Sequence, residues 1–333
     1  MAGGKERVLR RRIKSVQSTK KITKAMELIS ASRIVKAQQR VAAARPYSEQ
    51  ITAVIGNLAA SGAGLSSPLL QPRDDVRTIA YVVIASDRGL AGAYNGNVIR
   101  LAERAAAAAR AEGKEARFVV AGKKAETSLR FRGMPVEVAW HGMSDTPTYE
   151  NARTVAQYVT ERFESGEYDQ VELVYTQFLS VGNQRAVQRR FMPLDATVLE
   201  TAAAGDGPSA DYEFEPGPGA ILERLLPRYA EARLFAALLD ASASEHAARQ
   251  RAMKSATDNA EDLIVRLSRV MNRARQDSIT TEIMEIIGGA ESLAQGEGTP
   301  EDLLLDKVGS YDLFGTIHPP HDRHPHHHAG ATS

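Results

Sequence analysis

One heptad register that continues without interruption from Leu222 to Ala274 constrains this fold more than any other feature of the sequence. Mostly small or apolar residues recur there at alternating steps of three and four residues, which is the spacing of a coiled-coil seam. The predicted helix runs from about Gly219 to Ile287 and is on the order of 100 Å long at ~1.5 Å per residue. A helix of that length extends beyond any compact domain and requires a partner along its seam.

A second helical pattern occupies the amino-terminal end of the chain, from about Val8 to Leu58. Its later half follows a heptad register that starts at Ile34, and Pro46 inside the pattern predicts a kink or a local break. Extended backwards, the register places Lys20, Thr23, Glu27 and Ser30 on the seam and leaves Ile22, Met26 and Ile29 one position off it. The two ends of the chain therefore predict one long antiparallel coiled coil.

Between these helical ends the period of the hydrophobic pattern changes to that of strands. Strands are predicted at 77–86, 116–122, 135–142 and 170–178, helices at 96–111, 123–132 and 148–165, and an edge strand at 186–194. This alternation of strands and helices favours a mainly parallel sheet. The predicted fold class is α/β, with a long antiparallel coiled coil of the N- and C-terminal helices plus a central Rossmann-like α/β domain.

The predicted domain organisation follows from these patterns. An N-terminal coiled-coil helix covers 1–60, the central α/β domain 76–195, a connector 196–219, a C-terminal coiled-coil helix 220–290 and a flexible His-rich tail 291–333.

Composition and charge exclude several classes of protein. Lys and Arg number 42 against 41 Asp and Glu, so the overall charge gives no case for binding nucleic acid. The absence of cysteine excludes disulfides and thiolate metal sites. No apolar run approaches the ~20 residues that cross a bilayer, and the polar start "MAGGKERVLRRR" does not resemble a signal peptide. We therefore expect a soluble protein, or one held at a membrane only through partners.

The segment "VVIASDRGLAGAYNGN" has a nucleotide-binding interpretation, because a glycine-rich turn at a helix start can bind phosphate. Its glycines at 89, 92 and 96 do not form G-x-G-x-x-G, however, and no G-K-[ST] follows. A tight turn with Asn95 as a helix cap accounts for the same residues. Ser86 and Asp87 have no histidine signature that would complete a hydrolase triad.

Other polar features have both a structural and a functional interpretation. His246 is expected to be packed and hydrogen-bonded in a helix pair, and the histidines of the tail can chelate a transition metal but are typical of a disordered end. The basic residues of the amino terminus fit a solvated helix face or an acidic protein partner. No catalytic residue, cofactor site or metal site is predicted on this chain.

Near the end of the long helix, "NRARQDSITTEIMEI" gathers polar residues within two turns. They are Arg275, Gln276, Thr280 and Glu282. A polar outer face and a set of hydrogen bonds to an enclosing partner explain these residues about equally well.

Several long motifs, in order along the chain, resemble the gamma subunit of the bacterial F-type ATP synthase. They are "KITKAMELISASRIVKAQ", "RPYSEQI", "SDRGLAGAYN" and "MKSATDNAEDLIVRLSRVMNRARQDSITTEIMEIIGGAESL". The resemblance covers roughly Gly4 to Leu293, whereas this chain continues to Ser333. It implies a non-catalytic rotor shaft that couples proton-driven rotation of a c-ring to ATP synthesis, reversibly with ATP hydrolysis.

The resemblance also implies partners and a location. The coiled coil is expected inside a hexamer of alpha and beta subunits, with the α/β domain beside epsilon and the c-ring, peripheral on the cytoplasmic face of the bacterial cell membrane. Catalytic residues and Mg-ATP belong to beta, no cofactor is held on this chain, and no nucleic acid is bound. The residues that the resemblance assigns to beta contacts are Lys20, Lys21, Lys24, Met26, Arg249, Arg275, Gln276, Thr280 and Glu282.

Two other classes of function remain open from the residues alone. One is an α/β enzyme that uses its coiled coil only to dimerise, and it predicts turnover by the isolated chain. The other is a coiled-coil nucleic-acid adaptor, which predicts salt-sensitive binding of DNA or RNA.

Overall fold

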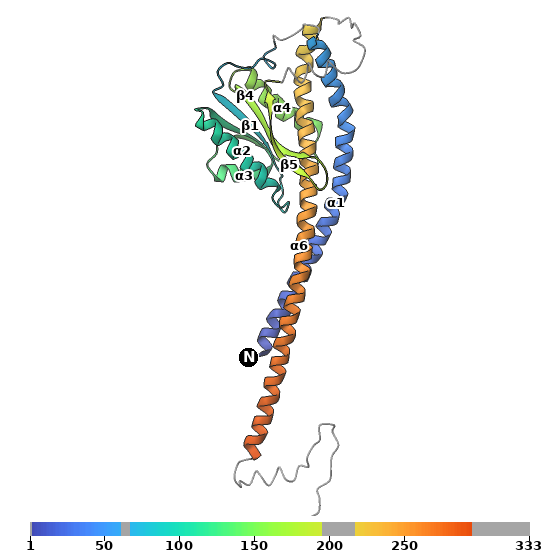
Figure 1. Ribbon diagram of the computed structural model, residues 1–333, viewed down its shortest axis with the longest axis vertical. Helices are drawn as coiled ribbons and strands as arrows, with labels where there is room; N and C mark the ends of the chain where they lie inside the picture. The colour runs from blue at the N-terminus through green and yellow to red at the C-terminus, as the bar shows by residue number, and fades with distance from the viewer. Residues whose placement is uncertain (1, 61–66, 195–216, 295–333) are drawn as a thin grey trace, which may run out of the picture. The chain divides into compact units, whose positions relative to one another are not determined.

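A computed structural model of the chain describes residues 2–60, 67–194 and 217–294 (Figure 1). The described residues form two compact units, one made of residues 17–262 and the other of residues 2–16 with 263–294. Nearly all of the predicted connector and tail lie outside the described residues.

Two long helices form at the ends of the chain, as the heptad patterns predict. Helix α1 spans Ala2–Ala60 and helix α6 spans Pro218–Ala294. Of the kink or break predicted at Pro46, the break is wrong, because α1 continues through this residue. Pro46 and Ala42, whose carbonyl loses its helical donor, are both exposed, so water can satisfy the carbonyl that proline leaves unpaired.

The central segment forms a five-stranded sheet in the order β3-β2-β1-β4-β5, parallel except for the antiparallel edge strand β5. This confirms the predicted α/β alternation and the edge strand. The elements are β1 Thr78–Ile84, α2 Tyr94–Ala111, β2 Glu115–Ala121, α3 Lys123–Phe131, β3 Val136–Trp140, α4 Tyr149–Glu164, β4 Gln170–Phe178 and β5 Gln184–Met192.

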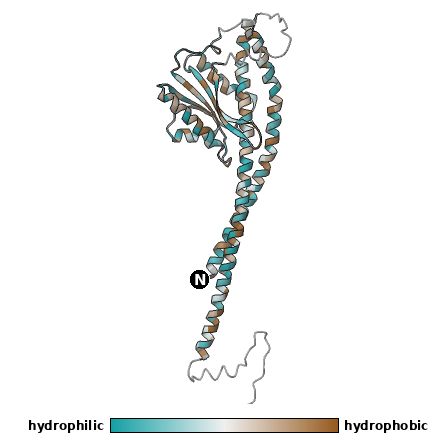
Figure 2. Cartoon of the chain, in the orientation of Figure 1, coloured by the Kyte–Doolittle hydropathy of each residue, from teal (hydrophilic) through white to brown (hydrophobic). Residues whose placement is uncertain are grey.

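The sheet separates two hydrophobic cores, because successive side chains of a strand point to opposite faces. In β1, Ala80 and Val82 pack in a core shared with α4, α1 and α6, whereas Tyr81 and Val83 pack in a core shared with α2 and α3. In Figure 2, the two long helices carry many hydrophilic residues interspersed with hydrophobic ones. Within residues 17–262, one face of the sheet therefore packs against both α1 and α6.

The paired part of α1 follows the predicted seam. Thr23, Ser30 and Ile34 are buried, whereas Ile22 is 61% exposed and Ile29 is 53% exposed. The predicted off-seam positions of Ile22 and Ile29 are therefore confirmed. These positions leave two large apolar side chains of α1 facing outward.

Gly122 lies where β2 ends and α3 begins, with φ at 120°. A β-carbon at this position would lie 2.1 Å from the carbonyl oxygen of Ala85. Only glycine allows the ends of β1 and β2 to approach this closely.

Candidate functional site

The first candidate surface lies on α1 and comprises Lys20, Lys21, Lys24 and Met26. The Nζ atom of Lys20 lies 3.0 Å from Oε1 of Glu261 on α6, and Nζ of Lys24 lies 3.1 Å from Oε1 of Glu27 on its own helix. Lys21 is exposed. Because Lys24 and Glu261 are more than half exposed, these ion pairs contribute little to stability and can exchange partners readily.

Met26 is half-buried and lines a cavity of about 280 Å³ beside this surface. The cavity is lined by Met26, Ile29, Ser30, Arg33, Arg88, Gly89, Leu90, His246 and Arg249. Three guanidinium groups line it, of which Arg33 is paired with Asp145 and Arg249 with Glu245.

Arg249 does not lie on the surface of the chain, because it is 6% exposed. Its Nη2 atom donates to Oε1 of Glu245 at 2.6 Å and to the carbonyl oxygen of Gly89 at 3.3 Å. The next residue, Leu90, has a φ of 63° and is 62% exposed. Arg249 thus bonds to the segment that presents an outward-facing leucine in a strained backbone conformation.

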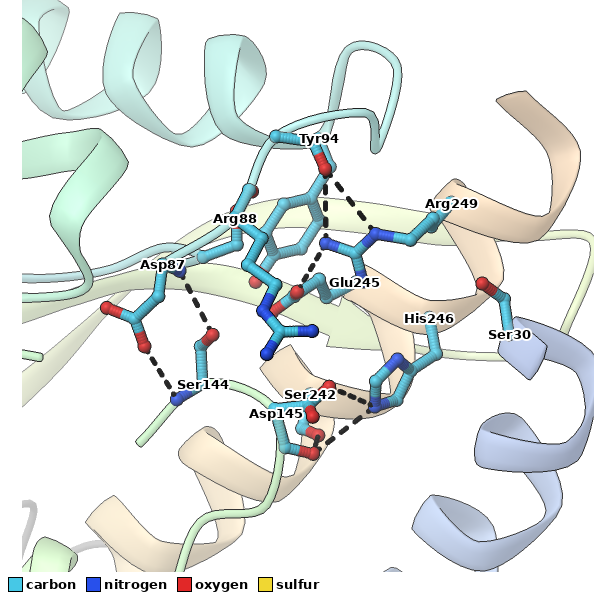
Figure 3. A network of polar contacts seen from close by, with 12 residues as sticks. Ser30, Asp87, Arg88, Tyr94, Ser144, Asp145, Ser242, Glu245, His246 and Arg249 are labelled. Carbon is cyan, nitrogen blue, oxygen red and sulfur yellow. Dashed lines mark hydrogen bonds and ion pairs between the residues drawn. The ribbon is translucent and has the colours of Figure 1, made fainter. Parts of the chain in front are cut away.

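The polar network around Arg249 joins α6 to the loops that follow β1 and β3 (Figure 3). Burial raises the pKa of Glu245, and the neighbouring Arg249 opposes that increase. His246 is buried, its Nε2 atom lies 3.2 Å from the carbonyl oxygen of Asp145, and burial lowers its pKa. The packed, hydrogen-bonded histidine that the sequence predicts is confirmed.

An ion pair between Arg33 and Asp145 was not predicted. It connects α1 to the segment after β3, and Ser242 of α6 donates to the carbonyl oxygen of Asp145 at 3.1 Å. The two charged residues are far apart in the sequence, and no motif contains both of them. No signal in the sequence pairs them.

The end of the sheet where open α/β folds bind ligands is partly filled by the chain itself. The strand order reverses at β1 and β4, and the crevice beyond their carboxyl ends is the usual binding place. Here the hydroxyl of Tyr94 donates to the carbonyl of Ala241 on α6 at 3.1 Å, and the hydroxyl of Ser244 donates to the carbonyl of Thr176 at 3.2 Å. The gap beside Tyr94 and Ala241 is too small for a water molecule. A separate cavity of about 360 Å³ remains beside Gly92 and Thr176.

The polar residues after β1 have structural roles. Ser86 is buried, and its backbone N–H donates to Oδ1 of Asn95 at 3.0 Å. Asn95 therefore does not cap α2 as predicted, since the N-cap residue is Ala93. The carboxylate of Asp87 accepts backbone bonds from Lys123 at 3.0 Å and Gly142 at 2.9 Å, which fixes the start of α3.

The second candidate surface lies on α6, in the unit of residues 2–16 and 263–294. It contains Arg275, Gln276, Thr280 and Glu282, which are all exposed. Large apolar side chains are exposed beside them: Met284 is 66% exposed and Ile286 is 67% exposed. A purely solvated polar face does not carry such residues, so their presence favours a contact surface for a partner. Arg249 lies in the other unit.

The described ranges contain neither a metal-binding cluster nor a membrane-spanning helix. Among residues 2–60, 67–194 and 217–294, no group of three or more His, Cys, Asp or Glu side chains is placed to hold a metal ion. Within the same ranges, every helix is too short or too polar to traverse a lipid bilayer.

Comparisons with known proteins agree with this architecture. The profile of the ATP synthase family matches residues 5–293. The chain is 52% identical to the ATP synthase gamma chain of Parafrankia sp. (strain EAN1pec) over 297 residues, which are 88% of this chain and 99% of the relative. It is 47% identical to that of Mycolicibacterium smegmatis over 302 residues, covering 86% and 97% of the two chains.

A solved structure supports the fold. A chain of the Euglena gracilis mitochondrial ATP synthase in rotational state 3 matches with a TM-score of 0.62 and 18% identity, over 90% of this chain and 98% of that one. The matched family profile and the close relatives extend over most of the sequence. The chain therefore belongs to the ATP synthase family, among its gamma chains.

Proposed function

We propose that this chain drives the beta-subunit sites of an ATP synthase through two contact surfaces, one on α1 and one on α6. As a gamma chain it is a non-catalytic central-stalk subunit that functions in ATP synthesis within a membrane-associated complex, and catalysis resides on the beta subunit. The proposal concerns how this stalk subunit engages its partners.

The observation that carries the proposal is the exposed end of α6. Every side chain from Ile279 to Leu293 is exposed, and this stretch combines polar groups with large apolar ones. Exposing these apolar side chains to water is unfavourable in free energy. A ring of alpha and beta subunits that encloses it would bury the apolar side chains and leave Arg275, Gln276, Thr280 and Glu282 to form specific hydrogen bonds.

The α1 surface carries positive charge, which complements an acidic segment of the beta subunit. Exposed, exchangeable ion pairs hold Lys20 and Lys24, and Lys21 is exposed to solvent. Met26 adds an apolar contact between them. The attraction must remain modest, since a deeply buried ion pair would resist breaking at each step of rotation.

Arg249 has a different role in this proposal from the direct beta contact that the family resemblance assigns to it. Because its guanidinium is buried against Glu245 and Gly89, we assign it a positioning role. It holds the segment that presents Arg88 and Leu90, both exposed, and beta would meet that segment instead of Arg249 itself.

The remaining partners and the location follow from the same proposal. Epsilon and the c-ring would engage the α/β domain, so that proton-driven rotation of the ring turns the stalk and ATP hydrolysis reverses it. Because the close relatives are gamma chains of bacteria, we infer the cytoplasmic face of the cell membrane. We infer no cofactor on this chain.

The experiment is a double substitution on α6 in the purified complex. Arg275→Ala with Gln276→Ala should weaken assembly with alpha and beta and lower ATPase turnover, while the circular dichroism of the free chain stays unchanged because both side chains are exposed. Asn97→Ala with Arg100→Ala removes a comparable exposed pair from α2, and it should leave both properties intact. Unchanged turnover in a fully assembled complex of the α6 variant would refute the α6 contact.

The partner can be identified separately because the chain contains no cysteine. A single Glu282→Cys variant can carry a thiol-reactive photocrosslinker. Irradiation of the complex should join this chain to beta or alpha. Crosslinks to neither subunit would contradict an enclosed α6 surface.

A further inference from the structure

A large cavity in the described part of the chain is not used by the proposed function. Its volume is about 620 Å³, and it lies where α1, α4 and α6 meet in the unit of residues 17–262. That volume falls within the ~300–1,000 Å³ typical of small-molecule sites. We refer to it as the three-helix cavity.

Three aromatic rings contribute to its wall. They belong to Tyr47 of α1, Tyr149 of α4 and Phe235 of α6. The rings of Tyr149 and Phe235 meet edge to face, with centroids 5.7 Å apart. The Tyr149 hydroxyl donates to Oε2 of the buried Glu231 at 2.8 Å. Two of the three rings are therefore held in place without a ligand.

A carboxylate is set into this apolar wall. Asp240 of α6 lines the cavity next to the buried Leu239 and is itself half-buried. Burial raises its pKa to about 6, while a backbone bond from Phe178 and the charges of Arg189 and Arg45 oppose the increase. No salt bridge to Asp240 forms among the described residues. At neutral pH the cavity thus contains a negative charge that lacks a direct cationic partner.

The other charges of the cavity lie at its rim. Arg45 and Glu49 face each other at 3.9 Å and are 73% and 70% exposed. Arg228 is also exposed. Water and salt screen these exposed groups, whereas the carboxylate of Asp240 is screened much less. The charge that a ligand inside the cavity would meet is therefore that of Asp240.

We propose that the three-helix cavity binds an amphipathic organic cation, with its ammonium group on the carboxylate of Asp240 and its aromatic or aliphatic body between Tyr47, Tyr149 and Phe235. Aromatic faces attract cations, and a carboxylate in an apolar wall forms a stronger ion pair than one in water. An anion of the same shape is repelled by Asp240. A neutral molecule gains only the apolar contacts.

The test uses the full chain and three fluorescent probes of one shape. Naphthylmethylammonium carries the proposed charge, naphthylmethanol is its neutral isostere, and naphthoate is the anion. Fluorescence polarisation gives the affinity of each. The cation should bind at least about tenfold more tightly than the alcohol at pH 8, and naphthoate should bind most weakly.

Substitutions locate the binding. Asp240→Asn should reduce the affinity for the cation to that for the alcohol, because it keeps the shape and removes the charge. Ala236→Trp fills the cavity from an exposed lining position and should abolish binding of both probes. Ala43→Trp is the matched control. Ala43 is exposed, does not line the cavity, and lies roughly opposite Val41 and Ser48 on α1, since an α-helix has about 3.6 residues per turn.

Two results would overturn the proposal. Equal affinities for the cation and the alcohol in the unsubstituted chain would exclude a role for the Asp240 charge. Binding that survives Ala236→Trp, or that Ala43→Trp removes as well, would place the probe elsewhere. Circular dichroism and the thermal midpoint of each variant establish that it is folded before its affinity is compared.

Discussion

The hydroxyl oxygens of Thr23 on α1 and Thr257 on α6 lie 2.8 Å apart in the seam between the two helices, and both side chains are buried. Each hydroxyl is also within bonding distance of a carbonyl of its own helix, at 3.1 Å from Lys20 and 2.8 Å from Met253. A hydroxyl carries a single proton, so one threonine donates across the seam while the other donates along its own helix. This polar pair occurs where the heptad pattern is weakest in apolar residues.

A double-mutant cycle tests this pair. Thr257→Val should destabilise the chain by about 1–2 kcal/mol, because it removes a donor and leaves the buried Thr23 hydroxyl without its cross-helix partner. Adding Thr23→Val should restore much of the loss, since two methyl groups then pack in the same space. Urea unfolding measures both steps. Strictly additive losses would show that the two hydroxyls do not interact.

Removal of Arg249 should be among the most destabilising single changes in the chain. Arg249→Ala leaves the carboxylate of Glu245 buried without its partner, and a loss of about 3–5 kcal/mol in the free energy of unfolding is expected. Glu245→Gln with Arg249→Met should cost clearly less, because no charge remains buried. If the single and double variants unfold at the same urea concentration, the buried pair is not the cause of the destabilisation.

Asp240 makes stability depend on pH. Its pKa is about 6 in the folded chain, above its ordinary value of 3.8, so the folded state binds more protons than the unfolded state between those values. The stability contributed by the protonated carboxyl is present below pH ~4 and is lost as pH rises through ~6. Asp240→Asn should therefore stabilise the chain by about 1–3 kcal/mol at pH 8.

The same substitution should have almost no effect near pH 4, where Asp240 is protonated when folded. Unfolding curves of both proteins at the two pH values provide the comparison. A gain of equal size at both would mean that the charge of Asp240 is not responsible.

Met26→Lys should impair coupling more than it impairs folding. The new ammonium would enter a cavity that Arg33, Arg88 and Arg249 already line, and it would add a cation where we propose that beta approaches. ATP-driven proton pumping in membrane vesicles should fall more than the ATPase rate does. Met26→Leu keeps the apolar contact and should preserve both rates, whereas equal losses of pumping and hydrolysis in Met26→Lys would contradict the coupling role.

Much of the fold could be predicted because its signals are local and repeated. The heptad register of α6, the strand runs and the off-seam positions of Ile22 and Ile29 all depend on periods that the sequence displays directly. The break at Pro46 was mispredicted because a proline on the water-facing side of a helix loses little when solvent reaches the freed carbonyl. Asn95 was mispredicted because its side chain bonds to the backbone of Ser86 and not to its own helix start.

The site could be predicted only in part, for a physical reason. The exposure of residues such as Arg275 and Gln276 can be predicted from their position on a helix face. The structure leaves both exposed, as a contact surface requires. The burial of Arg249 depends on where Glu245 and the turn at Gly89 meet in three dimensions. The cation-binding cavity likewise needs Tyr47, Tyr149 and Asp240 from three helices, and no spacing in the sequence joins them.

Direct observation of rotation tests the central claim of a torque-transmitting stalk most strictly. A Phe131→Cys variant offers a single attachment point, since the chain contains no cysteine and Phe131 is 90% exposed. With the alpha and beta subunits fixed to glass and a bead attached at this cysteine, ATP should drive stepwise rotation of the bead in one direction. Sustained ATP hydrolysis by the assembled complex while the bead does not turn would contradict the account.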